Sequence, residues 1–222
     1  MNIQSQPGAG VRRGSLFERM RADLSAGVFA PDERLTELEL VRRYAEGRPA
    51  VRTAIASLER EGFVKCEPNR GARVRKLGVD EAIDIAQVQR ELAGLCASLA
   101  AERRTERDIA DLRALAMQMH VAAASGSREA VVTTATAFDE RLRAAARQPI
   151  AGDTLHRWDL LTRGHRVAAL GSEERVSALL REYDAVVNAV ADGDARGARR
   201  LAELHAQSVI DALRKEDKQP PA

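Results

Sequence analysis

Two arginines four residues apart, Arg48 and Arg52, are the residues whose type and spacing most clearly indicate a chemistry. Side chains separated by four positions lie on the same face of a helix. Each guanidinium can bond a guanine edge through two hydrogen bonds or hold a phosphate. Helix amides near Gly47 would add a site for an anion. For two arginines alone, a solvated arginine face is the preferred interpretation.

A basic hairpin directly after this helix changes that interpretation. Strands are expected at 63–66 and 72–75, with residues 67–71 forming the turn between them. Arg70 at the hairpin tip would bring a cation to a minor groove or to the DNA backbone. Gly71 would permit a positive φ and a close approach to DNA. The helix and hairpin together favour DNA binding.

Three short helices must position these cations, and we expect them at 15–26, 36–44 and 49–61. The first two begin with a Ser or Thr that is followed three residues later by Glu, the capping-box pattern. The third has Pro in its first turn and Gly directly after its last residue. One face of the third helix carries an apolar stripe that should be buried: Val51, Ala54, Ile55 and Leu58.

The rest of the chain has a pattern that predicts helices. Aromatic residues make up only 3% of the sequence, which also favours a mostly helical protein. Polar or Gly- and Pro-containing breaks separate the expected helices. The fold class is therefore mainly α, with a winged helix-turn-helix domain at 14–77, a helical domain at 79–215, and tails at 1–13 and 216–222. The later helices are expected at 80–103, 106–124, 128–147, 154–170, 173–191 and 195–214.

Charge and composition narrow the function classes. Residues 1–76 hold 15 Lys or Arg and 10 Asp or Glu, whereas the remainder holds 20 and 23. A basic first part joined to a slightly acidic second part suits a nucleic-acid module linked to another domain. Cys66 and Cys96 form no CxxC pattern and fit a reducing compartment. With no signal peptide and no long apolar run, we expect a cytoplasmic protein without a membrane partner.

The N-terminal motifs resemble the winged helix of GntR-type bacterial transcriptional regulators. That resemblance implies DNA contacts at Arg34, Arg48, Arg52, Arg70 and Gly71. Two positions depart from the family pattern, since Glu46 and Gly47 replace an apolar residue and a Ser. The matching segments are Arg34-Leu35-Thr36-Glu37, Leu40-Val41, Arg48-Pro49-Ala50-Val51-Arg52, Glu61-Gly62-Phe63-Val64 and Arg70-Gly71.

The helical remainder resembles the ligand-sensing domain of the FadR branch of this family, known as the FCD domain. The resemblance implies an antiparallel helical bundle around a cavity, where many members hold a divalent metal through one Asp and three His. The corresponding residues here are Ala135, Asp139, Tyr183 and His205. Because a tight site needs several converging donors, we expect neither a transition-metal site nor another cofactor.

Asp139, Tyr183 and His205 are instead candidates for a polar cluster that binds an organic effector directly. The alternative is a satisfied buried network without a ligand. Nearby cations could pair with a carboxylate on such an effector. The candidates are Arg90, Arg163 and Arg166, and Trp158 and His165 could line the same cavity or belong to the core.

These features predict a ligand-responsive transcriptional regulator. We expect a homodimer that binds a near-palindromic operator and acts as a repressor released by a small organic effector, for which a carboxylate is one candidate. One alternative is a constitutive regulator whose second domain only dimerises. Another is a helical enzyme with an accessory winged helix. No nucleophile–base arrangement or phosphate-binding loop supports that enzyme, so no catalytic residue is assigned.

Overall fold

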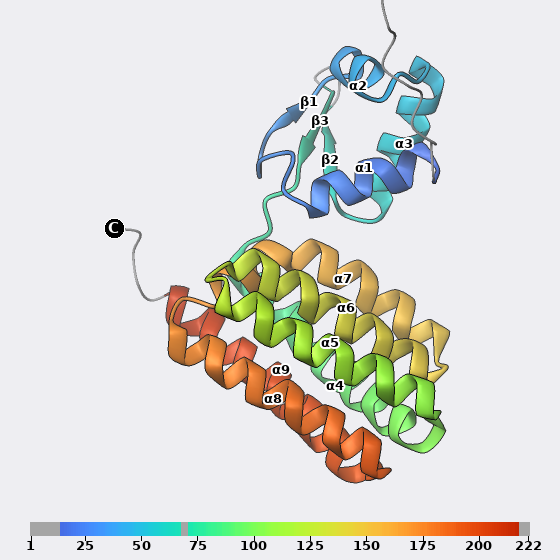
Figure 1. Ribbon diagram of the computed structural model, residues 1–222. Helices are drawn as coiled ribbons and strands as arrows, with labels where there is room; N and C mark the ends of the chain where they lie inside the picture. The colour runs from blue at the N-terminus through green and yellow to red at the C-terminus, as the bar shows by residue number, and fades with distance from the viewer. Residues whose placement is uncertain (1–13, 68–70, 218–222) are drawn as a thin grey trace, which may run out of the picture. The chain divides into compact units, whose positions relative to one another are not determined.

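The computed structural model describes residues 14–67 and 71–217. The chain divides into two compact units, residues 1–76 and residues 77–222 (Figure 1). Unit 1 combines short helices with a small sheet, and unit 2 is all-helical in its described part. The mainly α fold predicted from the sequence is therefore confirmed.

In its described residues, unit 1 contains three helices and a three-stranded antiparallel sheet with the strand order β1-β3-β2. β1 pairs Arg34 with Arg73, and β2 pairs Val64 with Val74. The sequence pattern predicted only the two hairpin strands, because a strand of two residues shows no alternation. The elements are α1 (Leu16–Ser25), β1 (Arg34–Leu35), α2 (Glu37–Tyr44), α3 (Arg48–Arg60), β2 (Val64–Glu67) and β3 (Gly71–Val74).

Local hydrogen bonds explain where the first helices of unit 1 begin. The Ser15 hydroxyl accepts a bond from the Glu18 amide, and the Glu18 carboxylate accepts from the Ser15 amide at 2.7 Å. This capping box satisfies amides that have no partner within the helix. The Thr36 hydroxyl caps α2 by accepting a hydrogen bond from the amide of Glu39. Both predicted N-terminal caps are confirmed.

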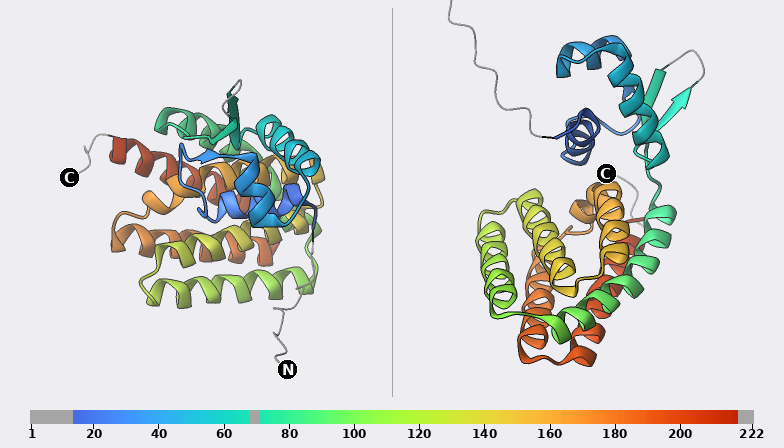
Figure 2. Two further views of the ribbon diagram at one scale, coloured as in Figure 1. Left: turned by 90° about the horizontal axis from the view of Figure 1, so that it is seen from above. Right: turned by 90° about the vertical axis from the view of Figure 1, so that its right-hand side faces the viewer.

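Between residues 77 and 217, unit 2 packs six long helices side by side around a common interior (Figure 2). α7 begins at Pro149, five residues before the predicted start, because Pro suits the first turn of a helix and does not break the chain there. α9 continues into the predicted tail. The helices are α4 (Val79–Arg103), α5 (Glu106–Ala124), α6 (Arg128–Ala146), α7 (Pro149–Ala168), α8 (Glu173–Asp192) and α9 (Ala195–Asp217).

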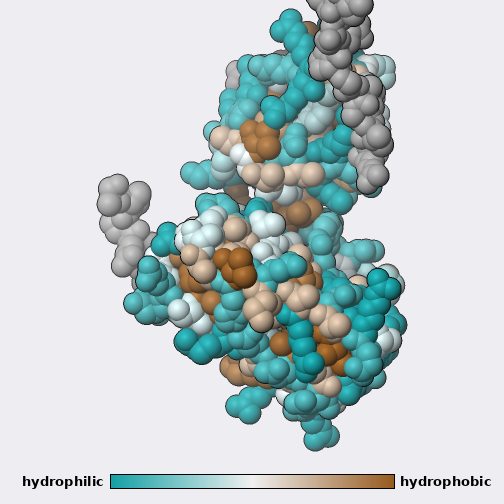
Figure 3. Space-filling view, viewed as in Figure 1, coloured by the Kyte–Doolittle hydropathy of each residue, from teal (hydrophilic) through white to brown (hydrophobic). Residues whose placement is uncertain are grey.

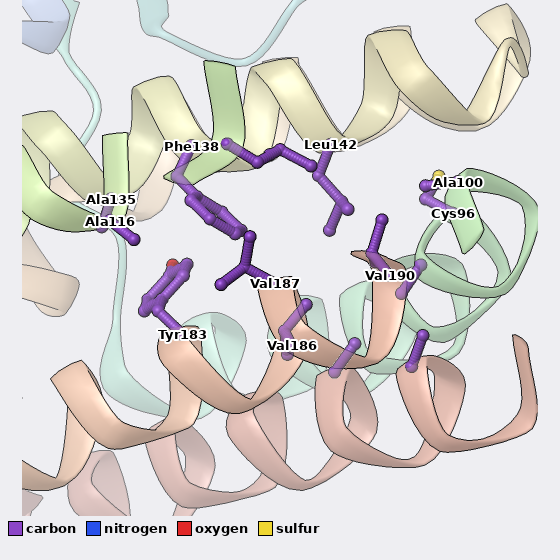
Figure 4. Packing of buried hydrophobic residues seen from close by; sticks show 14 of the residues in the cluster. Cys96, Ala100, Ala116, Ala135, Phe138, Leu142, Tyr183, Val186, Val187 and Val190 are labelled. Carbon is purple, nitrogen blue, oxygen red and sulfur yellow. The ribbon is translucent and has the colours of Figure 1, made fainter. Parts of the chain in front are cut away.

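The core of unit 2 is built around Phe138, whose side chain is fully buried. Its ring packs edge-on against that of Tyr183, with ring centres 4.9 Å apart, beside Ala135 and Leu142 (Figure 4). On the visible face of the molecule, hydrophilic residues are interrupted by separate apolar patches (Figure 3). Within the described ranges, no helix has both the length and the apolar character that a membrane span requires.

Candidate nucleic-acid interface and internal cavity

Helix α3 has one buried face and one exposed face. Arg48 and Arg52 are both exposed. Because apolar burial fixes the rotation of the helix, the two guanidiniums stay on the solvent side. α2 and α3 therefore form a helix-turn-helix whose second helix presents two cations near its N-terminus. The stripe that packs inward is the predicted one: Val51, Ala54, Ile55 and Leu58.

Arg52 is held in place by a carboxylate of the preceding helix. Its Nε lies 2.6 Å from Oε1 of Glu37, and 67% of the Arg52 side chain remains exposed. The hydrogen bond from Arg52 lowers the pKa of Glu37, and the same bond raises the pKa of Arg52. Exposed ion pairs contribute little stability. The pair therefore orients Arg52 but leaves it able to turn toward another anion.

The turn before α3 places the remaining N-terminal residues. Gly47 is the N-cap of α3, and Pro49 in the first turn has no amide hydrogen. The first turn thus offers fewer amides to an anion than most helices do. Glu46, which departs from the family pattern, pairs with Arg19 of α1 at 2.6 Å. This ion pair connects the turn to α1.

The sheet brings Arg34 beside the base of the wing. Arg34 is exposed on β1, directly opposite Arg73 on β3. Gly71 has φ of +83°, and an added Cβ would lie 3.1 Å from the carbonyl oxygen of Leu35. Glycine is therefore required here by both backbone conformation and space. The predicted contact at Arg70 lies outside the described residues.

Unit 2 contains a small cavity of about 90 Å³, which is lined by α4, α6, α7 and α9 and is partly open to solvent. Five of its polar lining residues are called here the polar wall: Gln89, Asp139, Arg143, Asp159 and Arg166. His165 and His205 also line the space, and the apolar lining comes mainly from Ala82, Ala86, Ala93, Leu142, Leu155, Val209 and Leu213.

The polar wall is one connected network of charges. Nη1 of Arg143 donates to Oδ2 of Asp159 at 2.7 Å. Arg166 lies between two carboxylates, at 3.0 Å from Oδ2 of Asp139 and 3.4 Å from Oδ1 of Asp159. The Tyr183 hydroxyl donates to Oδ1 of Asp139 at 3.0 Å. Two guanidiniums thus neutralise two carboxylates inside the bundle.

Burial sets the protonation behaviour of this network. Removal from water raises the pKa of Asp159, although Arg166 and Arg143 oppose the rise. Burial beside Asp139 also raises the pKa of the Tyr183 hydroxyl, which keeps it a donor. For Arg166, burial lowers the pKa, but Asp139 and Tyr183 outweigh burial and raise it. Arg166 is therefore a permanent cation in the polar wall.

The predicted effector residues have different locations. Asp139 and His205 line the cavity, and Tyr183 reaches it through its bond to Asp139. Arg90 and Arg163 are not among the lining residues. Arg90 donates to Gln207 and Glu91, and Arg163 donates to Thr133. The sequence analysis missed four polar lining residues: Gln89, Arg143, Asp159 and Thr162.

The residues at the metal positions of the resembled domain offer few free donors to a metal ion. Ala135 supplies no donor, and Asp139 is already bonded to Arg166 and Tyr183. His205 alone keeps a suitable arrangement, because Glu182 accepts from its Nδ1 at 2.7 Å and leaves Nε2 to face a ligand. A divalent cation would be repelled by the Arg166 guanidinium. In residues 14–67 and 71–217, no group of three His, Cys, Asp or Glu is arranged to hold a metal.

One cavity-lining residue also contacts the first residue of unit 2. Nε2 of His165 lies 2.9 Å from the backbone carbonyl oxygen of Leu77. Since a carbonyl only accepts, this ring nitrogen carries the hydrogen. Leu77 packs on a small cluster formed by Ala82, Ala169 and Leu213. His165 therefore connects the cavity lining to the residue at which unit 2 begins.

Unit 1 is a winged helix-turn-helix with exposed cations, and unit 2 is a helical bundle that contains a cavity. These two features together define a class of protein, the DNA-binding regulators that carry a sensing domain. The sequence comparisons agree with that class. Residues 13–74 match the family described as bacterial regulatory proteins, gntR family, and residues 84–208 match the FCD domain. The chain belongs to the GntR family, in the branch that carries an FCD domain.

Individual relatives support the same assignment. The Nta operon transcriptional regulator of Aminobacter aminovorans is 33% identical over 38% of this chain and 40% of its own length. The transcriptional repressor RspR of Escherichia coli is 22% identical over 90% of this chain and 87% of its own. The solved structure of E. coli McbR/YncC shares the fold, with a TM-score of 0.81 and 19% identity over 91% and 97% of the two chains.

Proposed function

We propose that the protein is a sequence-specific transcriptional repressor that a small organic effector releases from DNA. One observation carries the DNA-binding part of this proposal. Arg48 and Arg52 lie on the exposed face of the second helix of a helix-turn-helix whose opposite face is buried. That arrangement suits base reading in a major groove. The repressor name of RspR favours repression over activation.

A homodimer is part of the proposal. Two copies related by a two-fold axis would present two α3 helices to successive major grooves, so the operator should be near-palindromic. Sedimentation of the protein with and without a duplex measures this directly. A complex with one protein copy per operator would contradict it.

The contact between His165 and Leu77 supports release by an effector, because it links the cavity to the start of unit 2. By linkage, an effector that weakens operator binding must itself bind less tightly to the DNA-bound protein. Selection from random duplexes gives an operator, and titration of small molecules against that complex then tests release. If no compound in a broad metabolite panel changes operator affinity, the sensing part fails.

A constitutive regulator is the second candidate. The favouring observation is that Asp139 and Tyr183 are bonded to each other and to Arg166, as in a satisfied network without a ligand. The same titration separates the two candidates, because a constitutive regulator keeps its operator affinity in the presence of every compound.

A further inference from the structure

Leu38 is a large apolar residue on the surface of unit 1. It lies in the first turn of α2, directly after Glu37, and is 49% exposed. A single exposed leucine is ordinary in a folded protein. The position of this one makes it informative, because Glu37 holds Arg52 of α3 at 2.6 Å. Leu38 therefore borders the surface on which α3 displays its arginines.

The other contacts of α2 indicate which way Leu38 faces. Nε of Arg43 lies 3.7 Å from Oδ2 of Asp23 in α1, and the Arg43 guanidinium carbon lies 4.8 Å from the centre of the Phe29 ring. These contacts occupy the edge of α2 that faces α1. A helix turns by about 100° per residue, so Leu38 lies about 140° around the helix axis from Arg43. Leu38 is consequently on the edge of α2 that faces away from α1, next to Glu37.

The chemistry around Leu38 suits the edge of a base better than the DNA backbone. Carboxylates precede and follow it, at Glu37 and Glu39, and negative charges disfavour an approach to phosphates. Thymine is the one base that presents a methyl group in the major groove, where apolar side chains contact it. An arginine on the neighbouring helix reads guanine through hydrogen bonds instead.

We propose that Leu38 is a specificity-determining residue that contacts the C5 methyl group of a thymine in the major groove. The thymine lies in the same half-site as the base that Arg52 reads. This inference rests on the proposed DNA-binding function and adds to it an apolar contact from α2. Leu38 shields the methyl group from water and Arg52 bonds another base, so two different interactions read each half-site.

Replacing thymine by deoxyuridine in the operator tests the proposal, because deoxyuridine lacks only the methyl group. The operator is first selected from random duplexes with the wild-type protein. Each thymine is then replaced in turn, at the symmetry-related positions of both half-sites, and fluorescence anisotropy gives the affinities. One pair of replacements should weaken the wild type about fourfold per half-site, the loss expected when one methyl group is no longer buried.

Three variants assign the effect of the methyl group to a side chain. Leu38→Ala keeps a residue that favours a helix, and it should bind the thymine and deoxyuridine operators equally. Leu38→Met keeps an apolar side chain and should retain the preference for thymine. The matched control Val28→Ala removes a side chain that is 43% exposed and lies between α1 and β1, and it should respond to deoxyuridine as the wild type does.

The comparison of the two operators with the wild-type protein needs no variant, so it does not depend on how a substitution folds. The proposal is overturned if no replacement weakens the wild type, or if the selected half-sites contain no thymine. It is equally overturned if folded Leu38→Ala remains sensitive to deoxyuridine at the same position. The methyl group would then act through another residue or through the shape of the DNA.

Failure of this inference can be told apart from failure of the proposed function. If the operator is recognised through Arg48 and Arg52 but is insensitive to deoxyuridine, the protein reads DNA and the role of Leu38 is wrong. If no sequence is enriched in the selection, DNA reading itself is wrong, and the role of Leu38 is overturned with it.

Discussion

The two units keep their functional cations in opposite environments. Arg48 and Arg52 of unit 1 are exposed and can meet a large polyanion without rearranging the fold. Arg143 and Arg166 of unit 2 are enclosed and already paired with carboxylates. A surface cation can be replaced at small cost to stability, whereas removing a paired interior cation leaves its buried carboxylate without a counter-charge. The two units should therefore respond differently to the same kind of substitution.

A substitution in the core of unit 2 should cause the largest loss of stability. Phe138→Ala removes a fully buried ring and should lower the free energy of unfolding by about 3–5 kcal/mol, because it leaves a cavity. Chemical denaturation followed by circular dichroism measures the loss. The control Val88→Ala, at a side chain that is 49% exposed, should change stability by less than about 0.5 kcal/mol. Equal losses in the two variants would contradict the assigned core.

The exposed arginines of α3 should affect DNA binding and leave stability unchanged. Arg48→Ala or Arg52→Ala should cost about 1–3 kcal/mol of specific binding and change the preference at one base position. Fluorescence anisotropy with the selected operator and its single-base variants measures both quantities. Arg60→Ala at the other end of α3 is the matched control. A uniform loss across all sequences would assign the arginine to phosphate contact.

The buried carboxylate of Asp108 should make unit 2 sensitive to acid. Burial alone would raise its pKa, but hydrogen bonds from Thr105 and Arg147 lower the pKa from 3.8 to about 2. Because the folded pKa is the lower one, this stabilisation is complete above about pH 5 and is lost as the pH falls through 2. Asp108→Asn should lose about 1–2 kcal/mol at neutral pH.

Unfolding measured between pH 7 and pH 2 tests this prediction. The difference in stability between wild type and Asp108→Asn should shrink as the pH falls below 4. A difference that stays constant over this range would show that the carboxylate charge contributes nothing.

Removing the hydrogen bond between His165 and Leu77 should have the smallest effect of these changes, and it should act only on the coupling between effector binding and operator binding. His165→Phe keeps the ring volume and removes the donor to the Leu77 carbonyl, so the coupling between effector and operator should fall by about 1 kcal/mol. Operator affinity with and without a releasing compound measures that coupling. Operator affinity without effector should remain unchanged. If the coupling in His165→Phe equals that of the wild type, this hydrogen bond does not transmit effector binding to the DNA-binding unit.

The sequence predicted the features of unit 1 that depend on local spacing. Capping at Ser15 and Thr36 follows from a three-residue interval, and the placement of Arg48 and Arg52 follows from a four-residue one. The two-residue strand β1 was not predicted, because it is defined by its pairing with β3 and not by a pattern in its own sequence. Local patterns therefore predict elements whose hydrogen bonds are local.

The charge network of unit 2 could not be predicted in this way. Asp159 and Arg166 lie on α7 and meet Arg143 and Asp139 of α6. Which side chains face one another depends on the rotation and packing of both helices, which sequence spacing does not give. The resemblance indicated Asp139, Tyr183 and His205, but Arg143 sits at none of the family positions compared. Its significance follows only from its burial and its partners.

The central claim is that α3 and the wing read a DNA sequence. Selection of the purified protein against random duplex oligonucleotides at physiological salt tests it most directly, with the Arg48→Ala, Arg52→Ala double variant in parallel. The account predicts one enriched near-palindromic sequence for the wild type and its loss in the double variant. A wild-type protein that enriches no sequence, or a double variant that enriches the same one equally well, would contradict the claim.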